Sequence, residues 1–139
     1  MSESDTTLLS ADDVYRIARR APRLPPIGCE CETLRCPGWE SLSGGFDESA
    51  LRPVGALPLA ADAGDATLDE FHPAGTSYWS ADAPIALSWF PYNRCAVWQC
   101  RACGRAFLRY TEFGGYYVDP RIRELDPALI VAGAALARG

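Results

Sequence analysis

The stretch CAVWQCRACGRAFLRY, from Cys95 to Tyr110, decides the expected fold. Residues 96–99 and 106–110 are rich in the apolar and aromatic side chains that are typical of short β-strands. Between them lies Cys100-Arg-Ala-Cys103-Gly104, a tight turn whose glycine lets the backbone bend sharply. We therefore expect a β-hairpin that carries two cysteines at its tip.

The spacing of these two cysteines is typical of a metal site. Zinc prefers four ligands in a tetrahedron, and a tight turn supplies two of them because it points both thiolates inward. A second cluster, Cys29, Cys31 and Cys36, lies far upstream in the sequence and would supply the other two ligands. In a reducing compartment, clustered cysteines indicate metal binding more than disulfides or free core thiols.

The Cys100-x-x-Cys103-Gly104 motif resembles the cysteine turn of zinc-ribbon and treble-clef modules, in which it sits at the tip of a β-hairpin. The resemblance covers only about a fifth of the chain. It implies a four-cysteine zinc scaffold and no particular activity. Iron is the alternative metal, because a rubredoxin-like site also uses four thiolates in a tetrahedron.

We expect the four ligands to be Cys31, Cys36, Cys100 and Cys103. The upstream pair has a permitted spacing and is followed by a Pro-Gly turn. Cys29 is the first substitute, since we expect an extended Cys29-x-Cys31 segment to point its two side chains apart. Cys95 is expected to be a buried strand cysteine that behaves as a small hydrophobic residue.

The rest of the sequence predicts an α+β fold in a single domain over residues 1–139, with residues 1–9 as a flexible tail. Ser10 and Asp13 have the spacing of a capping box, and helical periodicity continues until Pro22, so a helix is expected at 11–20. The strands of an antiparallel sheet are expected at 67–72, 76–79, 85–90, 96–99, 106–110 and 116–118. Short C-terminal helices are expected at 120–125 and 127–136, because each begins with an Asp-Pro pair suited to a helix start.

Charge and hydropathy exclude some classes of protein. The net charge of -5 argues against a surface that binds nucleic acid as a whole. Residues 38–82 hold eight acidic side chains and one basic one, whereas residues 94–111 hold four arginines and no acid. No signal peptide or membrane-spanning stretch is evident, so a soluble cytoplasmic protein is expected.

Two enzyme patterns fail at named positions. A cytidine-deaminase site needs H-x-E followed by P-C-x-x-C, but here the order is Glu70-Phe71-His72, and Gln99 replaces the proline. A thioredoxin-like site needs its cysteine pair to open a helix, whereas Cys103 is followed by a predicted strand. His72, the only histidine, is more typical of a hydrogen-bonded structural residue than of a ligand in a catalytic zinc site.

Two binding functions remain from the sequence. The first is a protein-interaction or regulatory module that zinc holds in shape, with another protein as the partner; the sequence indicates no oligomeric state. The alternative is a zinc-ribbon nucleic-acid binder. It would use four arginines near the turn and three aromatic side chains for stacking: Arg94, Arg101, Arg105 and Arg109, with Trp98, Phe107 and Tyr110.

Overall fold

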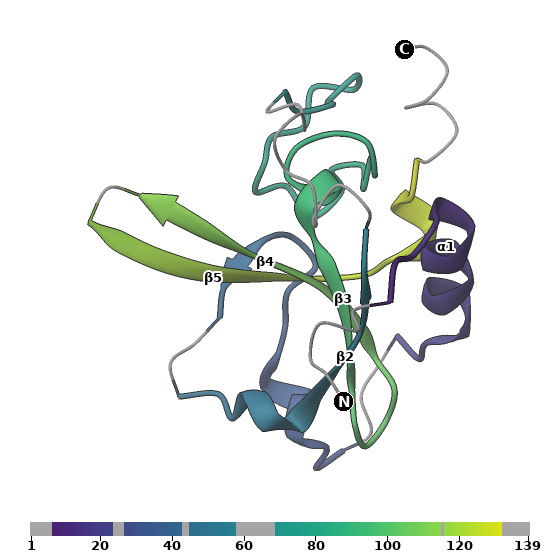
Figure 1. Cartoon of the computed structure of the whole chain (residues 1–139), viewed down its shortest axis with the longest axis vertical. Helices are drawn as coiled ribbons and strands as arrows, with labels where there is room; N and C mark the ends of the chain where they lie inside the picture. Colours follow the sequence, from purple (N-terminus) through teal and green to yellow (C-terminus); the bar gives the residue numbers. More distant parts are fainter. Residues whose placement is uncertain (1–6, 24–26, 43–44, 58–68, 115, 132–139) are drawn as a thin grey trace.

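The computed structural model describes residues 7–23, 27–42, 45–57, 69–114 and 116–131 of the 139-residue chain. These residues form one α-helix and a five-stranded sheet (Figure 1): α1 (Ala11–Arg20), β1 (Glu40–Ser41), β2 (Leu51–Ala56), β3 (Ala96–Cys100), β4 (Ala106–Gly114) and β5 (Tyr117–Glu124). The described part of the chain also contains four 3-10 helices: η1 (Glu30–Thr33), η2 (Glu48–Ala50), η4 (Tyr92–Arg94) and η5 (Pro127–Leu129). No helix among the described residues is long and apolar enough to cross a membrane.

The sheet has the strand order β1-β5-β4-β3-β2, and each pair of neighbours is antiparallel. The α+β class with an antiparallel sheet is therefore confirmed. β3 and β4 form a hairpin in which Gln99 pairs with Ala106 and Ala96 pairs with Arg109. Beyond that point β4 and β5 continue to pair up to Gly114 and Tyr117, and Figure 1 shows this part projecting away from the other strands.

Helix α1 begins where the capping box predicts. The Ser10 hydroxyl accepts from the Asp13 backbone N–H at 3.1 Å, and the Asp13 carboxylate accepts from the Ser10 N–H at 2.9 Å. These two bonds satisfy amide groups that the first helical turn leaves without a partner. Val14 and Ala18, one turn apart, are the buried residues of the helix.

Alternation along β4 gives the sheet two packed faces. Leu108 and Tyr110 belong to the larger core, which also contains Val14 of α1, whereas Phe107 belongs to a smaller core with Cys31 and other residues of the 31–51 segment. Because neighbouring residues of a strand point to opposite faces, the two cores lie on opposite sides of the sheet. The smaller core is the one that includes the cysteine clusters.

The predicted strands at 76–79 and 85–90 are wrong. Both segments are turns and irregular chain, and Ile85 makes only a single bridge, to Ile130. Residues 69–72 of the predicted first strand are also not a strand, and residues 67–68 lie outside the described part of the chain. The aromatic side chains that suggested strands contact other rings instead, as in the stacking of Tyr78 on Trp39 at 6.0 Å between centroids.

The helix predicted at 120–125 is also wrong, because these residues belong mostly to β5. Pro120 lies opposite Thr111 of β4, and its carbonyl accepts from the Leu42 N–H at 2.8 Å. The N–H and C=O of one residue point to the same side of a strand. The ring nitrogen of Pro120 therefore faces the side of β5 on which β1 lies, at the point where β1 has ended. A strand tolerates a missing donor at such an edge position. Of the second predicted helix, the structure shows η5, and residues 132–136 lie outside the described part.

The last residues of the expected N-terminal tail contact the sheet. Leu9 is buried and its N–H donates to the Ala56 carbonyl at 2.8 Å. A Cβ at Gly55 would lie 2.7 Å from the Thr7 carbonyl oxygen, so a glycine is needed for this close approach. Residues 7–9 are thus part of the packed structure, while the single-domain organisation stays a prediction.

Candidate metal centre

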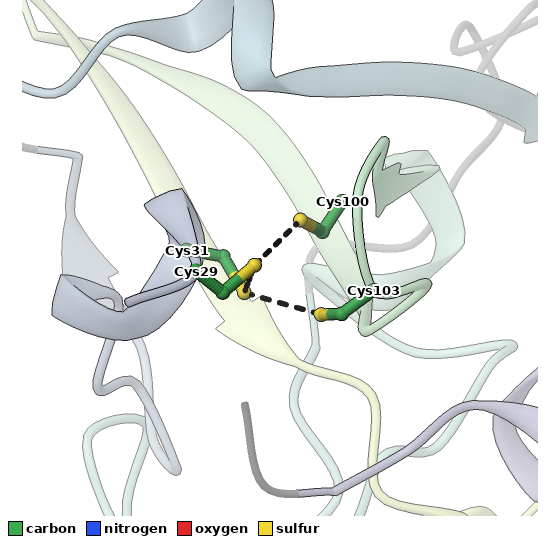
Figure 2. A group of neighbouring side chains, drawn as sticks. All are labelled: Cys29, Cys31, Cys100 and Cys103. Atoms are coloured by element: carbon green, nitrogen blue, oxygen red, sulfur yellow. Dashed lines mark hydrogen bonds between the residues drawn. The ribbon is translucent and has the colours of Figure 1, made fainter. Parts of the chain in front are cut away.

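Four cysteine sulfurs lie together between η1 and the tip of the β3–β4 hairpin (Figure 2): those of Cys29, Cys31, Cys100 and Cys103. All four atoms lie within 4.8 Å of one another. Cys31 and Cys100 are buried, whereas Cys29 and Cys103 are partly exposed. The chain thus brings two distant clusters to one point and forms a group that could hold a metal ion.

The separations between the sulfurs match the requirements of a tetrahedral metal. Cys31 Sγ lies 3.4 Å from Cys103 Sγ and 3.7 Å from Cys29 Sγ, and Cys29 Sγ lies 3.5 Å from Cys100 Sγ. A zinc ion with four thiolates at about 2.3 Å places its sulfurs about 3.8 Å apart along each edge of the tetrahedron. Small shifts of the side chains would therefore bring the ligands to their places.

The hairpin turn contributes backbone donors to the sulfurs as well as the two cysteines. The backbone N–H groups of Ala102 and Cys103 donate to Cys100 Sγ, and that of Arg105 donates to Cys103 Sγ. Gly104 has a φ of 87°, a left-handed conformation that suits glycine, and its N–H donates to the Cys100 carbonyl at 3.0 Å. Such donors stabilise metal-bound thiolates and fix their orientation.

The upstream half of the group depends on η1. Cys29 is the residue before this 3-10 helix and Cys31 lies within it, and the turn is closed by the Gly28 N–H, which donates to the Glu32 carboxylate at 3.0 Å. The expectation that Cys29 and Cys31 point apart is wrong. Even in an extended strand, residues two positions apart share a face, and the tighter turn of η1 brings their sulfurs together.

The structure therefore joins three of the four expected ligands with Cys29, and it places Cys36 elsewhere. Cys36 is buried in the smaller core, and its carbonyl accepts from the Glu124 N–H at 2.8 Å. Cys95 is buried in the larger core, as expected, and its thiol donates to the Pro91 carbonyl at 3.3 Å. Which cysteines bind a metal stays a prediction, but the geometry favours Cys29 over Cys36.

The pKa values of the cysteines separate the buried thiols from the hairpin. Burial raises the pKa of Cys36 to about 12 and also raises those of Cys95 and Cys31. At Cys100 burial acts in the same sense, but the backbone N–H groups of Cys103 and Ala102 and the neighbouring thiols outweigh it and lower the pKa to about 7. Cys100 is thus prepared to ionise near neutral pH, which favours metal binding.

His72 lies outside the cysteine group. Its Nε2 is 2.7 Å from the Glu70 carboxylate, and its Nδ1 is 2.6 Å from the Thr76 hydroxyl. These contacts close a local turn, as expected for a structural histidine. A zinc site with His72 as a ligand and an open position for water is therefore not formed among the described residues.

Arg105 is the residue near the site whose role the sequence did not indicate. The nucleic-acid hypothesis needs this guanidinium on the surface, but Arg105 is only 3% exposed and its guanidinium lies against Cys31. Arg109 is ion-paired with Glu48 at 2.5 Å and lies over the Trp98 ring at 4.5 Å. No local signal in the sequence indicates the role of Arg105, because its contact with Cys31 depends on how the 29–36 segment packs on the sheet.

One side of the cysteine group is open. A hollow of about 430 Å³ is lined by Cys29 and Cys100 together with their neighbours around the start of η1 and in the hairpin turn, and by the two residues before β2. Arg101 at its rim donates from its side chain to the Ser49 carbonyl at 2.9 Å, and its backbone N–H donates to the Ala50 carbonyl at 2.8 Å. The group is therefore reachable from solvent on the Cys29–Cys100 side.

Comparison with known proteins adds no family. No protein-family model matches the chain, and neither a curated protein nor a solved structure matches it.

Proposed function

We propose that this chain is a small zinc-binding protein in which Cys29, Cys31, Cys100 and Cys103 hold one structural zinc ion. The observation that carries the proposal is the convergence of four sulfurs to within 4.8 Å from two segments some seventy positions apart. The backbone donors of the hairpin turn support the proposal, because N–H groups stabilise negatively charged thiolates much more than neutral thiols. The turn itself resembles that of zinc-ribbon modules, whereas the η1 half of the site departs from that pattern.

The ligand set favours a structural role over a catalytic one. Four cysteines complete a tetrahedron and leave no position for a water molecule that zinc could activate. Zinc would tie the segment around η1 to the β3–β4 hairpin, which are otherwise joined across the smaller core. Zinc is preferred to iron because it fits the same ligands without redox chemistry, and metal analysis separates the two.

On this basis the protein acts as a non-enzymatic protein-interaction or regulatory module, with another protein as its partner. The support is the acidic surface of the described 40–48 and 69–82 segments together with the exposed Trp79, an aromatic residue type enriched at interfaces. The nucleic-acid alternative is less favoured. Arg105 is buried and Arg109 is paired with Glu48, so neither guanidinium is free to neutralise a phosphate.

Native mass spectrometry with elemental analysis tests the metal. The wild-type chain is expected to carry one zinc ion, and Cys100→Ser and Cys103→Ser are each expected to lose it. Cys95→Ser is the matched control, since Cys95 is buried but remote from the group, and it should retain the ion. A wild-type protein that folds fully after chelation and binds neither zinc nor iron would overturn the proposal.

The interaction role is tested by affinity capture with zinc-loaded and chelator-treated protein side by side. A defined partner that is held by the loaded form and released on chelation is the expected result. Binding of single-stranded oligonucleotide at low salt, without a protein partner, would favour the alternative.

A further inference from the structure

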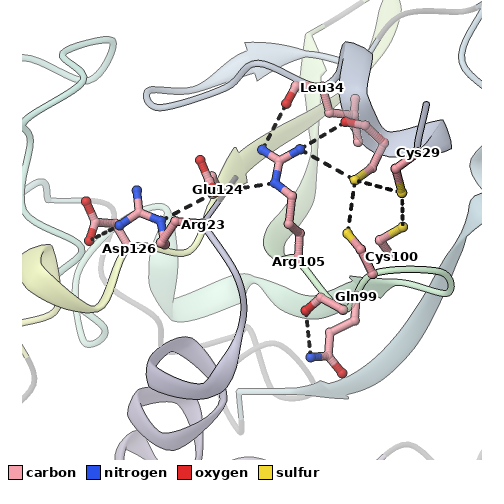
Figure 3. Close-up of polar contacts among 11 residues, drawn as sticks. Arg23, Cys29, Leu34, Gln99, Cys100, Arg105, Glu124 and Asp126 are labelled. Atoms are coloured by element: carbon pink, nitrogen blue, oxygen red, sulfur yellow. Dashed lines mark hydrogen bonds and ion pairs between the residues drawn. The ribbon is translucent and has the colours of Figure 1, made fainter. Parts of the chain in front are cut away.

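The buried side chain of Arg105 contacts the cysteine site directly (Figure 3). Its Nη1 donates to the Cys31 carbonyl at 2.9 Å and lies 3.5 Å from Cys31 Sγ, and its Nη2 donates to the Leu34 carbonyl at 3.0 Å. One guanidinium thus holds the backbone at both ends of the Cys31–Leu34 turn and also touches a sulfur.

A buried cation needs compensating charge, because desolvation of a charge is costly. The nearest carboxylate is that of Glu124, whose Oε2 lies 3.4 Å from Arg105 Nε, yet this buried Nε–H makes no hydrogen bond in the structure. Glu124 is also shared, since Arg23 Nε lies 3.5 Å from the same oxygen. Glu124 therefore gives Arg105 only part of the negative charge that it needs.

The cysteine group can supply the rest. Four thiolates around a divalent ion carry a net charge of minus two. A fixed positive charge beside one of the sulfurs lowers the energy of that anionic group, and the effect is large where water is excluded.

We infer that Arg105 is the counter-charge of the metal-bound thiolates, a positioning residue that both holds the Cys31 turn over the hairpin and stabilises the charge of the site. The inference rests on the proposed metal function. Glu124 opposes Arg105 in this arrangement, because its carboxylate reduces the positive potential that reaches the sulfurs. Arg23, which also pairs with Asp126 at 2.9 Å, in turn offsets Glu124.

The experiment that separates charge from simple structural support is cobalt substitution. Co²⁺ at a tetrahedral thiolate site gives a sulfur-to-metal charge-transfer band whose energy rises when positive potential stabilises the sulfur electrons. Arg105→Gln should shift this band to lower energy and weaken zinc binding by roughly 10–100-fold, as loss of an outer partner of a ligand commonly does. Glu124→Gln should shift the band the opposite way.

The matched control is Arg101→Gln. Arg101 is next to Cys100 in sequence, but its guanidinium donates to Ser49, so the band should stay in place and the zinc affinity should change less than about 3-fold. Opposite shifts for Arg105→Gln and Glu124→Gln support the inference. If Arg105→Gln fails to fold by circular dichroism, the shift in Glu124→Gln carries the test alone.

An unchanged band in whichever of the two variants folds would overturn the inference and leave Arg105 as a structural clamp only. That result differs from failure of the proposed function, in which the wild-type protein would give no tetrahedral cobalt spectrum at all.

Discussion

Cys29 Sγ lies 3.5 Å from Cys100 Sγ, although 71 positions separate the two residues in the sequence. Cys36, at a more familiar spacing from Cys31, is buried but lies outside the group of four sulfurs. Cys29→Ser is therefore expected to weaken zinc binding by about 100-fold or more, because one of four ligands is lost. Cys36→Ser should retain one zinc ion with nearly unchanged affinity, as measured by competition with a chromophoric chelator. Loss of zinc in Cys36→Ser with retention in Cys29→Ser would reverse the assignment.

The metal-free protein should show a distinct pH profile of alkylation at Cys100. The thiolate is the reactive form of cysteine, and the pKa of Cys100 is lowered to about 7 by backbone donors and neighbouring thiols that outweigh burial. Its labelling by iodoacetamide should fall roughly tenfold between pH 8 and pH 6, since the thiolate fraction falls by that factor. Peptide mapping by mass spectrometry measures the rate at each cysteine. A Cys100 rate that still rises tenfold from pH 8 to pH 9 would contradict the lowered pKa, and bound zinc should suppress the reaction.

Gly104→Ala should lower both stability and metal affinity. Gly104 has a φ of 87°, which costs a residue with a Cβ about 1–2 kcal/mol, and strain there would move the amide donors away from the sulfurs. A loss of about tenfold in zinc affinity is expected, with a lower melting temperature. Gly75→Ala is the matched control, because Gly75 has a φ of 86° and lies outside the cysteine site. It should show the same loss of stability without the loss of affinity; equal affinity losses in the two variants would refute a local effect on the turn.

Arg123 should be one of the residues most important for stability. Its side chain is fully buried and donates to the carbonyls of Pro37, Ala81 and Ala83 and to the Tyr92 hydroxyl. Arg123→Met leaves the three carbonyls without this donor, whereas the Tyr92 hydroxyl still accepts from Trp39 Nε1 at 3.2 Å. Each buried unsatisfied group costs about 1–3 kcal/mol, so a total loss of about 3–5 kcal/mol is expected. Urea denaturation measures the free energy of unfolding.

The control for Arg123 is Arg52→Met. Arg52 is exposed and donates to the Gln99 side chain at 2.8 Å, so its replacement should change the free energy of unfolding by less than about 0.5 kcal/mol. Similar losses in the two variants would show that the buried contacts of Arg123 contribute little.

Local signals predicted the helix and the hairpin well. The capping box at Ser10 and Asp13 depends only on neighbouring residues, and so does the turn at Gly104; both are seen in the structure. Long-range packing was harder to infer. The pairing of β5 with β4 outweighs the Asp-Pro signal for a helix start at Pro120. In the 76–90 segment, aromatic and apolar residues that pack into the larger core gave a sequence pattern typical of strands.

The candidate site was predicted in the same uneven way. Cys100 and Cys103 follow from a short motif, but the choice between Cys29 and Cys36 depends on the 3-10 turn of η1. The local clue to this turn was Glu32, which accepts from the Gly28 N–H and is not a common capping signal. The position of Arg105 beneath Cys31 could not be inferred, because it follows from how the 29–36 segment packs on the sheet.

The edge strands of the sheet, β1 and β2, limit how a partner could bind. At the outer side of β2, Leu8 forms a parallel bridge with Ala56, and the strand is interrupted by Pro53 and a bulge before Gly55. At the other side, β1 has only two residues. Short, irregular or covered edge strands discourage the addition of a further strand from another chain. Recognition through these edges is therefore unfavourable. Because both faces of the sheet are packed by the two cores, a partner would be bound mainly by side chains along the projecting part of β4 and β5.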